Sequence, residues 1–231
     1  MIDFLIQTDR QILLLLNGSD SLFVDGMAAT LTSALTWVPL YVVLFWLVMK
    51  NNETMRHILL VVMACAVCFL LSDGMAEGIM KPLVARLRPW QDASLKIYVD
   101  TLDGFRPLDY SFFSGHASNT FSIAVFFALM VRRRTFTVFM VAWSLINCWT
   151  RLYLGLHFPS DILTGLVWGA LVGTGVYVLY LRFYTLIGVK INYISSHYTP
   201  TGYALSDLNV VYTTMILTFI YAVIRSVTMA I

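Results

Sequence analysis

Residues 159–181 read PSDILTGLVWGALVGTGVYVLYL, and no charged residue occurs between Ile162 and Leu181. A helix needs about 20 mostly apolar residues to cross the hydrocarbon core of a bilayer. Glycines recur here at four-residue spacing, at positions 165, 169 and 173, which predicts a face of small residues packed against a neighbouring helix. The stretch therefore predicts a transmembrane helix that contacts a second helix closely.

Five other runs have a similar apolar character, and together with the first they predict six spans. They are Gly26–Met49, the run from Arg56 to Met80, Ala117–Val131, the short run Thr135–Thr150, and Leu208–Ile231, which contains Arg225. In the run that ends at Met80, Gly74 and Gly78 repeat the four-residue glycine spacing and predict helix packing there as well.

The composition of the 231 residues agrees with a membrane protein. Hydrophobic residues make up 59%, charged residues only 12%, and the mean hydropathy is +0.77. A soluble domain would be about a quarter charged, so a water-soluble globular protein and a disordered chain are both excluded. A net charge of +2 disfavours a nucleic-acid-binding protein, which needs a basic surface. Three cysteines do not support a disulfide framework.

The N-terminal residues predict an amphipathic helix that lies in the membrane interface. Apolar side chains share one helical face and polar ones another. The apolar set is Ile2, Leu5, Ile6, Ile12, Leu13 and Leu16, and the polar set is Asp3, Gln7, Arg10 and Gln11. A seventh span is the alternative, and Asp9 and Arg10 in its middle argue against it. The expected fold is an all-α polytopic membrane bundle of about six helices plus this interfacial helix, forming a single membrane domain over residues 1–231.

Charge placement predicts the sidedness. One face of the bundle has seven basic residues against two acids, and the other has eight against eleven. The first group is Lys50, Arg56, Arg132, Arg133, Arg134, Arg182 and Lys190. Because cytoplasmic loops carry an excess of Lys and Arg, this face is predicted to be cytoplasmic. The opposite face then points outward, toward the periplasm if the membrane is a bacterial inner membrane.

Three polar clusters fall on the predicted outer face. The first contains Lys81, Arg88 and Pro89, the second is Ser114-Gly115-His116, and the third contains Arg151, His157 and Asp161. Cations at an apolar boundary are costly unless an anion meets them, and arginine forks suit phosphate oxygens. Ser114 and Gly115 stand where a helix should begin, and free N–H groups at a helix N-terminus also favour an anion. The clusters predict a site for a tetrahedral anion.

The two histidines add chemistry to this site. Asp161 follows His157 by four residues across Pro159, so a helix entry there brings the carboxylate back to the imidazole. A carboxylate on one ring nitrogen fixes the tautomer and makes the other nitrogen more basic, which suits a nucleophile. His116 comes from another helix and is placed to protonate a leaving oxygen and then to activate water. The predicted reaction is phosphoryl transfer to histidine followed by hydrolysis.

These clusters resemble the signature of the type 2 phosphatidic acid phosphatase family. The family pattern is Lys, six residues, Arg-Pro, then Pro-Ser-Gly-His, then Ser-Arg, five residues, His, three residues, Asp. The chain departs from it at Phe113, where proline is usual, and at Thr150, where serine is usual. The resemblance covers about residues 58–185, which we take as the catalytic core. Vanadate-dependent haloperoxidases share the pattern, but they are soluble.

The resemblance implies a role for each matching residue. His157 matches the nucleophile, Asp161 its orienting acid and His116 the general acid. The phosphate-binding positions are matched by Lys81, Arg88, Ser114, Gly115 and Arg151. The family needs no metal or other cofactor. A lipid phosphate in the bilayer is the implied partner, with undecaprenyl diphosphate as the first expectation. Lipid A phosphate is the next, then phosphatidylglycerophosphate or phosphatidate. A phospholipid transporter without catalysis is the alternative class.

The sequence also suggests roles for several residues outside the three clusters. Asp73 and Glu77 are expected to hold Lys81 in a network, since acids within a span normally pair, and contact with a substrate head group is the alternative. Arg86 and Arg106 are expected to be solvated rather than to bind phosphate. The loop Gln91–Tyr110, with its four aspartates, is either a lid or selectivity element or a disordered outer loop. Cys65 and Cys68 are expected to fill the apolar core.

Overall fold

A computed structural model describes residues 2–102, 106–187 and 196–230. Within this part of the chain the regular elements are all helical, and the single β-type contact is an isolated bridge between Tyr198 and Ala204. The expected all-α fold is confirmed. The helices are α1 (Ile2–Leu16), α2 (Leu22–Thr32), α3 (Val38–Asn51), α4 (Met55–Asp73), α5 (Lys81–Val84), α6 (Gly115–Val131), α7 (Arg134–Tyr153), α8 (Pro159–Ile187) and α9 (Leu205–Ala230).

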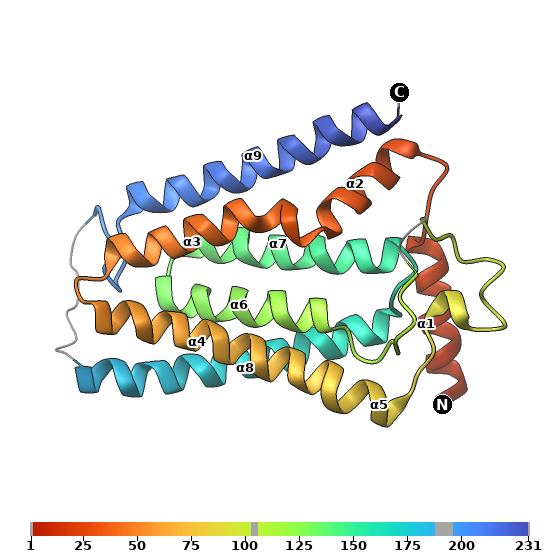
Figure 1. Ribbon diagram of the computed structural model, residues 1–231, viewed down its shortest axis with the longest axis horizontal. Helices are drawn as coiled ribbons and strands as arrows, with labels where there is room; N and C mark the ends of the chain where they lie inside the picture. The colour runs from red at the N-terminus through yellow and green to blue at the C-terminus, as the bar shows by residue number, and fades with distance from the viewer. Residues whose placement is uncertain (1, 103–105, 188–195, 231) are drawn as a thin grey trace.

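The long helices lie side by side along one axis, and α1 crosses one end of them (Figure 1). Four described segments are long and apolar enough to span a membrane: Ala34–Asn51, Met55–Gln91, Pro159–Leu186 and Leu205–Ala230. The chain is therefore a polytopic helical membrane protein. Helices α6 and α7 run along the same axis but do not meet these limits, so the count of six spans stays a prediction.

The span predicted over Gly26–Met49 is present over Ala34–Asn51, and the helix breaks before it at Ser33. Ser33 has an extended backbone, and a 3₁₀ turn over Ala34–Trp37 separates α2 from α3. The carbonyl of Thr30 accepts from the Ser33 amide at 3.3 Å and from the Thr36 hydroxyl at 2.6 Å, which closes the end of α2. Pro39 contributes to the break, since it has no N–H to donate back into the preceding turn.

Helices α6 and α8 pack at close range, as the glycine spacing predicts. A Cβ atom added at Gly165 or Gly169 would lie 2.7 Å from a backbone carbonyl of α6, and one at Gly173 would lie 2.5 Å from another. This close contact sets the start of α6 beside the start of α8. The same prediction is wrong for Gly74 and Gly78, where an added Cβ would meet nothing within 4 Å. Both lie in the π-helical segment Gly74–Met80 that follows α4.

Helix α1 is tied to the end of the bundle that carries the α7–α8 connection (Figure 1). Leu13 is fully buried in a small apolar cluster with Leu95, Val99 and Phe158. Asp9 is also buried, although it lies on a helix of mostly exposed side chains. Helix α1 therefore forms part of the structure at this end. Its position in the membrane interface stays a prediction.

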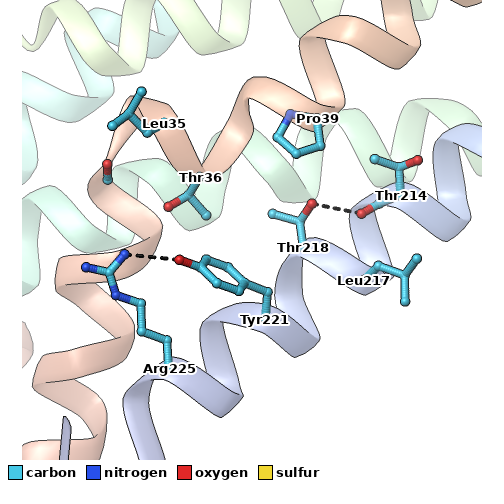
Figure 2. A pocket seen from close by; sticks show the side chains of 9 residues that line it. Leu35, Thr36, Pro39, Thr214, Leu217, Thr218, Tyr221 and Arg225 are labelled. Carbon is cyan, nitrogen blue, oxygen red and sulfur yellow. Dashed lines mark hydrogen bonds between the residues drawn. The ribbon is translucent and has the colours of Figure 1, made fainter. Parts of the chain in front are cut away.

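A groove of about 610 Å³ runs between the α2–α3 break and α9 (Figure 2). Leu35 and Leu217 on its rim are largely exposed, as expected for a surface that faces lipid. Arg225, the charge predicted within the last span, lines this groove and donates to the Tyr221 hydroxyl at 3.2 Å. No residue of the three polar clusters lines it.

Candidate active site

The three polar clusters come together at the α1 end of the bundle. Lys81 begins α5, and Arg88 lies in the loop that follows it. Ser114 caps α6, and the other positions come from the last turn of α7, its connection to α8 and the first turn of α8. Lys81, Arg88 and Arg151 are each less than a tenth exposed. Buried cations at one end of a membrane bundle can bind an anionic group.

The tight turn after α7 places His157. Gly155 has a positive φ of 64°, and a Cβ there would lie 2.5 Å from a methyl carbon of Val99. The Leu156 amide donates to the carbonyl of Arg151 at 3.0 Å and closes the turn. Only glycine fits both the backbone conformation and the space at position 155. The turn places His157, two residues later, in the site.

The hydrogen bonds of His157 define which ring nitrogen is available. Its Nδ1 lies 2.8 Å from the Ser111 carbonyl and 3.8 Å from a carboxylate oxygen of Asp161, so Nδ1–H is the donor. The Nε2 atom lies 3.3 Å from Nη1 of Arg88. The Nε2 lone pair therefore faces the buried cation. This is the geometry that a nucleophilic imidazole requires.

Asp161 is fully buried and held on both carboxylate oxygens. Oδ2 accepts from the Phe158 amide at 2.9 Å and from the Ser111 hydroxyl. Oδ1 accepts from Nη1 of Arg86 at 2.7 Å. With every oxygen satisfied, the carboxylate has a fixed position beside His157.

Arg86 is a structural cation that sequence reasoning placed in solvent. Besides Asp161 it binds Asp9 of α1 at 2.7 Å, and its guanidinium lies 3.8 Å from the ring centroid of Phe158. Asp9 also accepts from the backbone and hydroxyl of Ser160. Arg86 thus joins α1 to the start of α8 through two buried carboxylates.

Lys81 and Arg88 share a carboxylate. Lys81 Nζ lies 2.6 Å from Glu77 and 2.5 Å from Asp109. Nη2 of Arg88 contacts both Asp109 oxygens, at 2.9 and 2.8 Å, and Nη1 donates to the Leu156 carbonyl at 2.8 Å. The predicted pairing of Glu77 with Lys81 is therefore present. The sequence does not distinguish Asp109 from the other three aspartates of its loop.

Arg151 and His116 form the other half of the site. Nη2 of Arg151 contacts Nε2 of His116, and Nη1 donates to the Thr32 hydroxyl at 2.7 Å. Nε of Arg151 is buried and has no hydrogen-bond partner among the described residues. His116 is exposed and lies within electrostatic range of His157, Lys81 and Arg88. The two imidazoles therefore border the same cluster of cations.

Ser114 and Gly115 form the N-terminus of α6, as the sequence indicates. The Ser114 hydroxyl accepts from the Ala117 amide at 3.3 Å, and its own amide donates to the carbonyl of Asp161 at 3.2 Å. A Cβ on Gly115 would lie 3.1 Å from Glu77, so glycine lets the chain pass close to the carboxylate that holds Lys81.

The other residues that the sequence singled out lie elsewhere. Arg106 is exposed and donates to Thr101 at 3.0 Å, as expected for a solvated residue. Asp73 does not join the Lys81 network and instead accepts from Asn119 at 3.0 Å. The Thr150 hydroxyl contacts Thr32, and Cys65 and Cys68 pack in the apolar core as expected.

His157 is expected to stay neutral at physiological pH. It lies between α7 and α8, and burial lowers its pKa from 6.5 to about 4 because the charged form loses its hydration, while Asp161 opposes the shift. A histidine-selective ¹⁵N NMR titration, assigned with His157→Gln, should show protonation with a midpoint near pH 4. A midpoint near 6.5 would contradict the buried position. Because the pKa is depressed on folding, folding is disfavoured progressively as pH falls below 6.5.

Arg86→Gln should destabilise the protein and lower its activity. Removing the cation leaves Asp9 and Asp161 buried without their charged partner, which costs about 3 kcal/mol. We expect a lower melting temperature and at least a 10-fold lower kcat, measured on the same detergent-purified sample. Arg106→Gln removes an equal charge from an exposed position and should change neither. Equal behaviour of the two variants would argue against the link through Arg86.

The site combines buried cations with an oriented imidazole and a second imidazole, and it defines a membrane enzyme that acts on phosphate esters. The chain matches the family model described as "PAP2 superfamily" over residues 57–185. It therefore belongs to this family of type 2 phosphatidic acid phosphatases, and it is a lipid phosphatase.

Two curated relatives carry the name "Lipid A 4'-phosphatase". The protein from Bacteroides thetaiotaomicron is 36% identical over 75% of this chain and 77% of its own length. The protein from Porphyromonas gingivalis is 30% identical over 78% of this chain and 75% of its own length. No solved structure matches the chain significantly.

Proposed function

We propose that this protein hydrolyses a phosphate monoester of lipid A, at the outer face of a bacterial inner membrane, through a phosphohistidine intermediate. The observation that carries the mechanism is the position of Nε2 of His157, 3.3 Å from Nη1 of Arg88 and opposite the nitrogen bound by Ser111. Residues 58–185 supply the catalytic core within a single membrane domain.

In the first step, Nε2 of His157 attacks phosphorus and the bond to the lipid oxygen breaks. Lys81, Arg88 and Arg151 bind the phosphoryl oxygens and stabilise their negative charge, and the unpartnered Nε of Arg151 is one donor. The Gly115 amide, at the α6 N-terminus that Ser114 caps, adds a further donor. The negative charge of the bound phosphate favours the protonated form of His116, and this imidazolium gives its proton to the lipid oxygen, so the lipid leaves as a neutral alcohol.

In the second step, His116 takes a proton from a water molecule, and the oxygen attacks the phosphorus on His157. The N–P bond breaks, inorganic phosphate leaves and both imidazoles return to their starting states. The Ser111 carbonyl holds Nδ1–H in place, and the Asp161 carboxylate, 3.8 Å from Nδ1, stabilises the ring when Nε2 carries phosphate. No step requires a metal.

The relatives favour lipid A over undecaprenyl diphosphate, which the sequence had placed first. Both relatives bear a lipid A phosphatase name, and the chain covers about three quarters of each. The geometry is also compatible with a monoester, since Arg86 and Arg106 do not add cations to the site. We therefore assign the lipid A alternative, and we retain the outward orientation from the charge asymmetry.

Release of inorganic phosphate from a lipid panel tests this assignment. The panel contains lipid A, undecaprenyl diphosphate, phosphatidylglycerophosphate and phosphatidate in mixed micelles with EDTA. Highest kcat/KM on lipid A, with mass spectrometry showing loss of the 4'-phosphate, is the expected result. Preference for undecaprenyl diphosphate would overturn the substrate. A wild-type protein that binds these lipids and releases no phosphate would favour the transporter alternative.

A further inference from the structure

Asp109 occupies the part of the site where the phosphate should bind. It contacts Lys81 Nζ and both of its carboxylate oxygens contact Nη2 of Arg88, so it uses donors on two of the proposed phosphate-binding side chains. The pKa of Asp109 is lowered to about 2: burial opposes ionisation, but the hydrogen bonds and charges of Lys81 and Arg88 outweigh it. The carboxylate is therefore ionised across the physiological range, as phosphate would be.

The Asp109 side chain is much more exposed to solvent than the two cations that it contacts. The Asp109 side chain is 43% exposed, whereas those of Lys81 and Arg88 are 7% and 5% exposed. The carboxylate therefore covers the two cations on their open side. A phosphate that reaches the donors held by Asp109 must displace it.

The two cations do not depend on the Asp109 carboxylate for their positions. Lys81 keeps its ion pair with Glu77 at 2.6 Å. Arg88 keeps its bond to the Leu156 carbonyl at 2.8 Å, and its Nε donates at 3.0 Å to the backbone carbonyl of Asp109, which any residue would supply. Removing the charge of Asp109 thus leaves a preformed anion site with free donors.

We propose that Asp109 is an intramolecular competitor of phosphate, which closes the empty site, swings aside when the lipid phosphate binds, and helps to expel inorganic phosphate after hydrolysis. This inference rests on the proposed function. It gives the Gln91–Tyr110 loop a defined role in the site through one described residue. A competitor of this kind weakens the binding of substrate and product alike, because both must break the same ion pairs.

Asp109→Asn tests the proposal, because it removes the charge and keeps the size. Inorganic phosphate should raise the melting temperature of the variant at about 10-fold lower concentration than for the wild type. The KM for the lipid should fall by a similar factor while kcat does not rise, since product release slows. Asp109→Glu, which keeps the carboxylate, should stay near the wild type.

Asp92→Asn is the matched control. Asp92 lies in the same loop but pairs with Arg10 at 2.9 Å, away from Lys81 and Arg88, so its phosphate response should equal that of the wild type. The proposal is overturned if Asp109→Asn responds to phosphate like Asp92→Asn or more weakly. It is also overturned if Asp109→Asn and Asp109→Glu both fail to fold, since the carboxylate is then a fixed structural group.

The outcomes separate this inference from the function on which it rests. A wild type that releases phosphate from lipid and responds to inorganic phosphate, beside an unchanged Asp109→Asn variant, rejects only the competitor role. A wild type that neither releases phosphate nor responds to it rejects both.

Discussion

His157→Ala should abolish phosphate release from lipid, lowering kcat by about 10⁴-fold or more. The substitution removes the nucleophile, so the covalent route is lost rather than slowed, and only the electrostatic contribution of the cations is left. The cations themselves are held by other partners: Lys81 by Glu77 and Arg88 by the Leu156 carbonyl. Binding of inorganic phosphate should therefore persist in this variant. The measurement is phosphate release under single-turnover conditions, with phosphate-dependent melting as the binding readout.

His57→Ala is the control for this experiment. His57 lies in the first turn of α4, which starts at the end of the bundle opposite α1 (Figure 1), and it contacts Thr54 and stacks on Tyr184. Activity should be unchanged. If His157→Ala retained more than about a hundredth of the wild-type rate, another nucleophile or direct attack by water would have to replace the covalent step.

His116→Ala should slow the first step with lipid much more than with an aryl phosphate, because the two substrates differ in their leaving group. A lipid alkoxide leaves poorly without a proton, so lipid turnover should fall by about 10³-fold. The p-nitrophenolate of p-nitrophenyl phosphate leaves well without a proton, so the first step should still occur, and one equivalent of p-nitrophenolate should appear in a burst. Water is no longer activated in the second step, and the phosphoenzyme should accumulate. Stopped-flow absorbance with p-nitrophenyl phosphate measures both phases.

The size of the burst distinguishes the role of His157 from that of His116. His157→Ala should show no burst with the aryl phosphate, because the first step itself is missing. Equal losses on lipid and aryl phosphate in His116→Ala would assign this residue to phosphate binding through its contact with Arg151 rather than to proton transfer.

The sequence could predict features that depend on local pattern. Charge-free runs of membrane length gave the approximate positions of the long helices, and Ser114 before an apolar run gave the α6 N-terminus. The spacing of Gly165, Gly169 and Gly173 gave a contact face, because residues four apart share one side of a helix. The motif positions came together because they follow or precede span ends at one face of the bundle.

Features that depend on distant partners could not be predicted. Arg86 meets Asp9 across 77 positions and Arg151 meets Thr32 across 119, and no local pattern marks either pair. Ser111 binds Asp161 from a loop without periodicity. The break at Ser33 could not be predicted from hydropathy, because the residues on both sides of it are uncharged. Hydropathy describes the preference of side chains for solvent and not the geometry of the backbone.

Detection of phosphate on His157 tests the central claim most directly. His116→Ala, in which the intermediate should persist, is mixed with p-nitrophenyl phosphate and quenched in alkali, which preserves phosphohistidine. Peptides are then analysed by mass spectrometry. The account predicts one phosphoryl group on the peptide that contains His157, and none in the His116→Ala/His157→Ala double variant. A burst of p-nitrophenolate with phosphate on another residue, or on none, would contradict it.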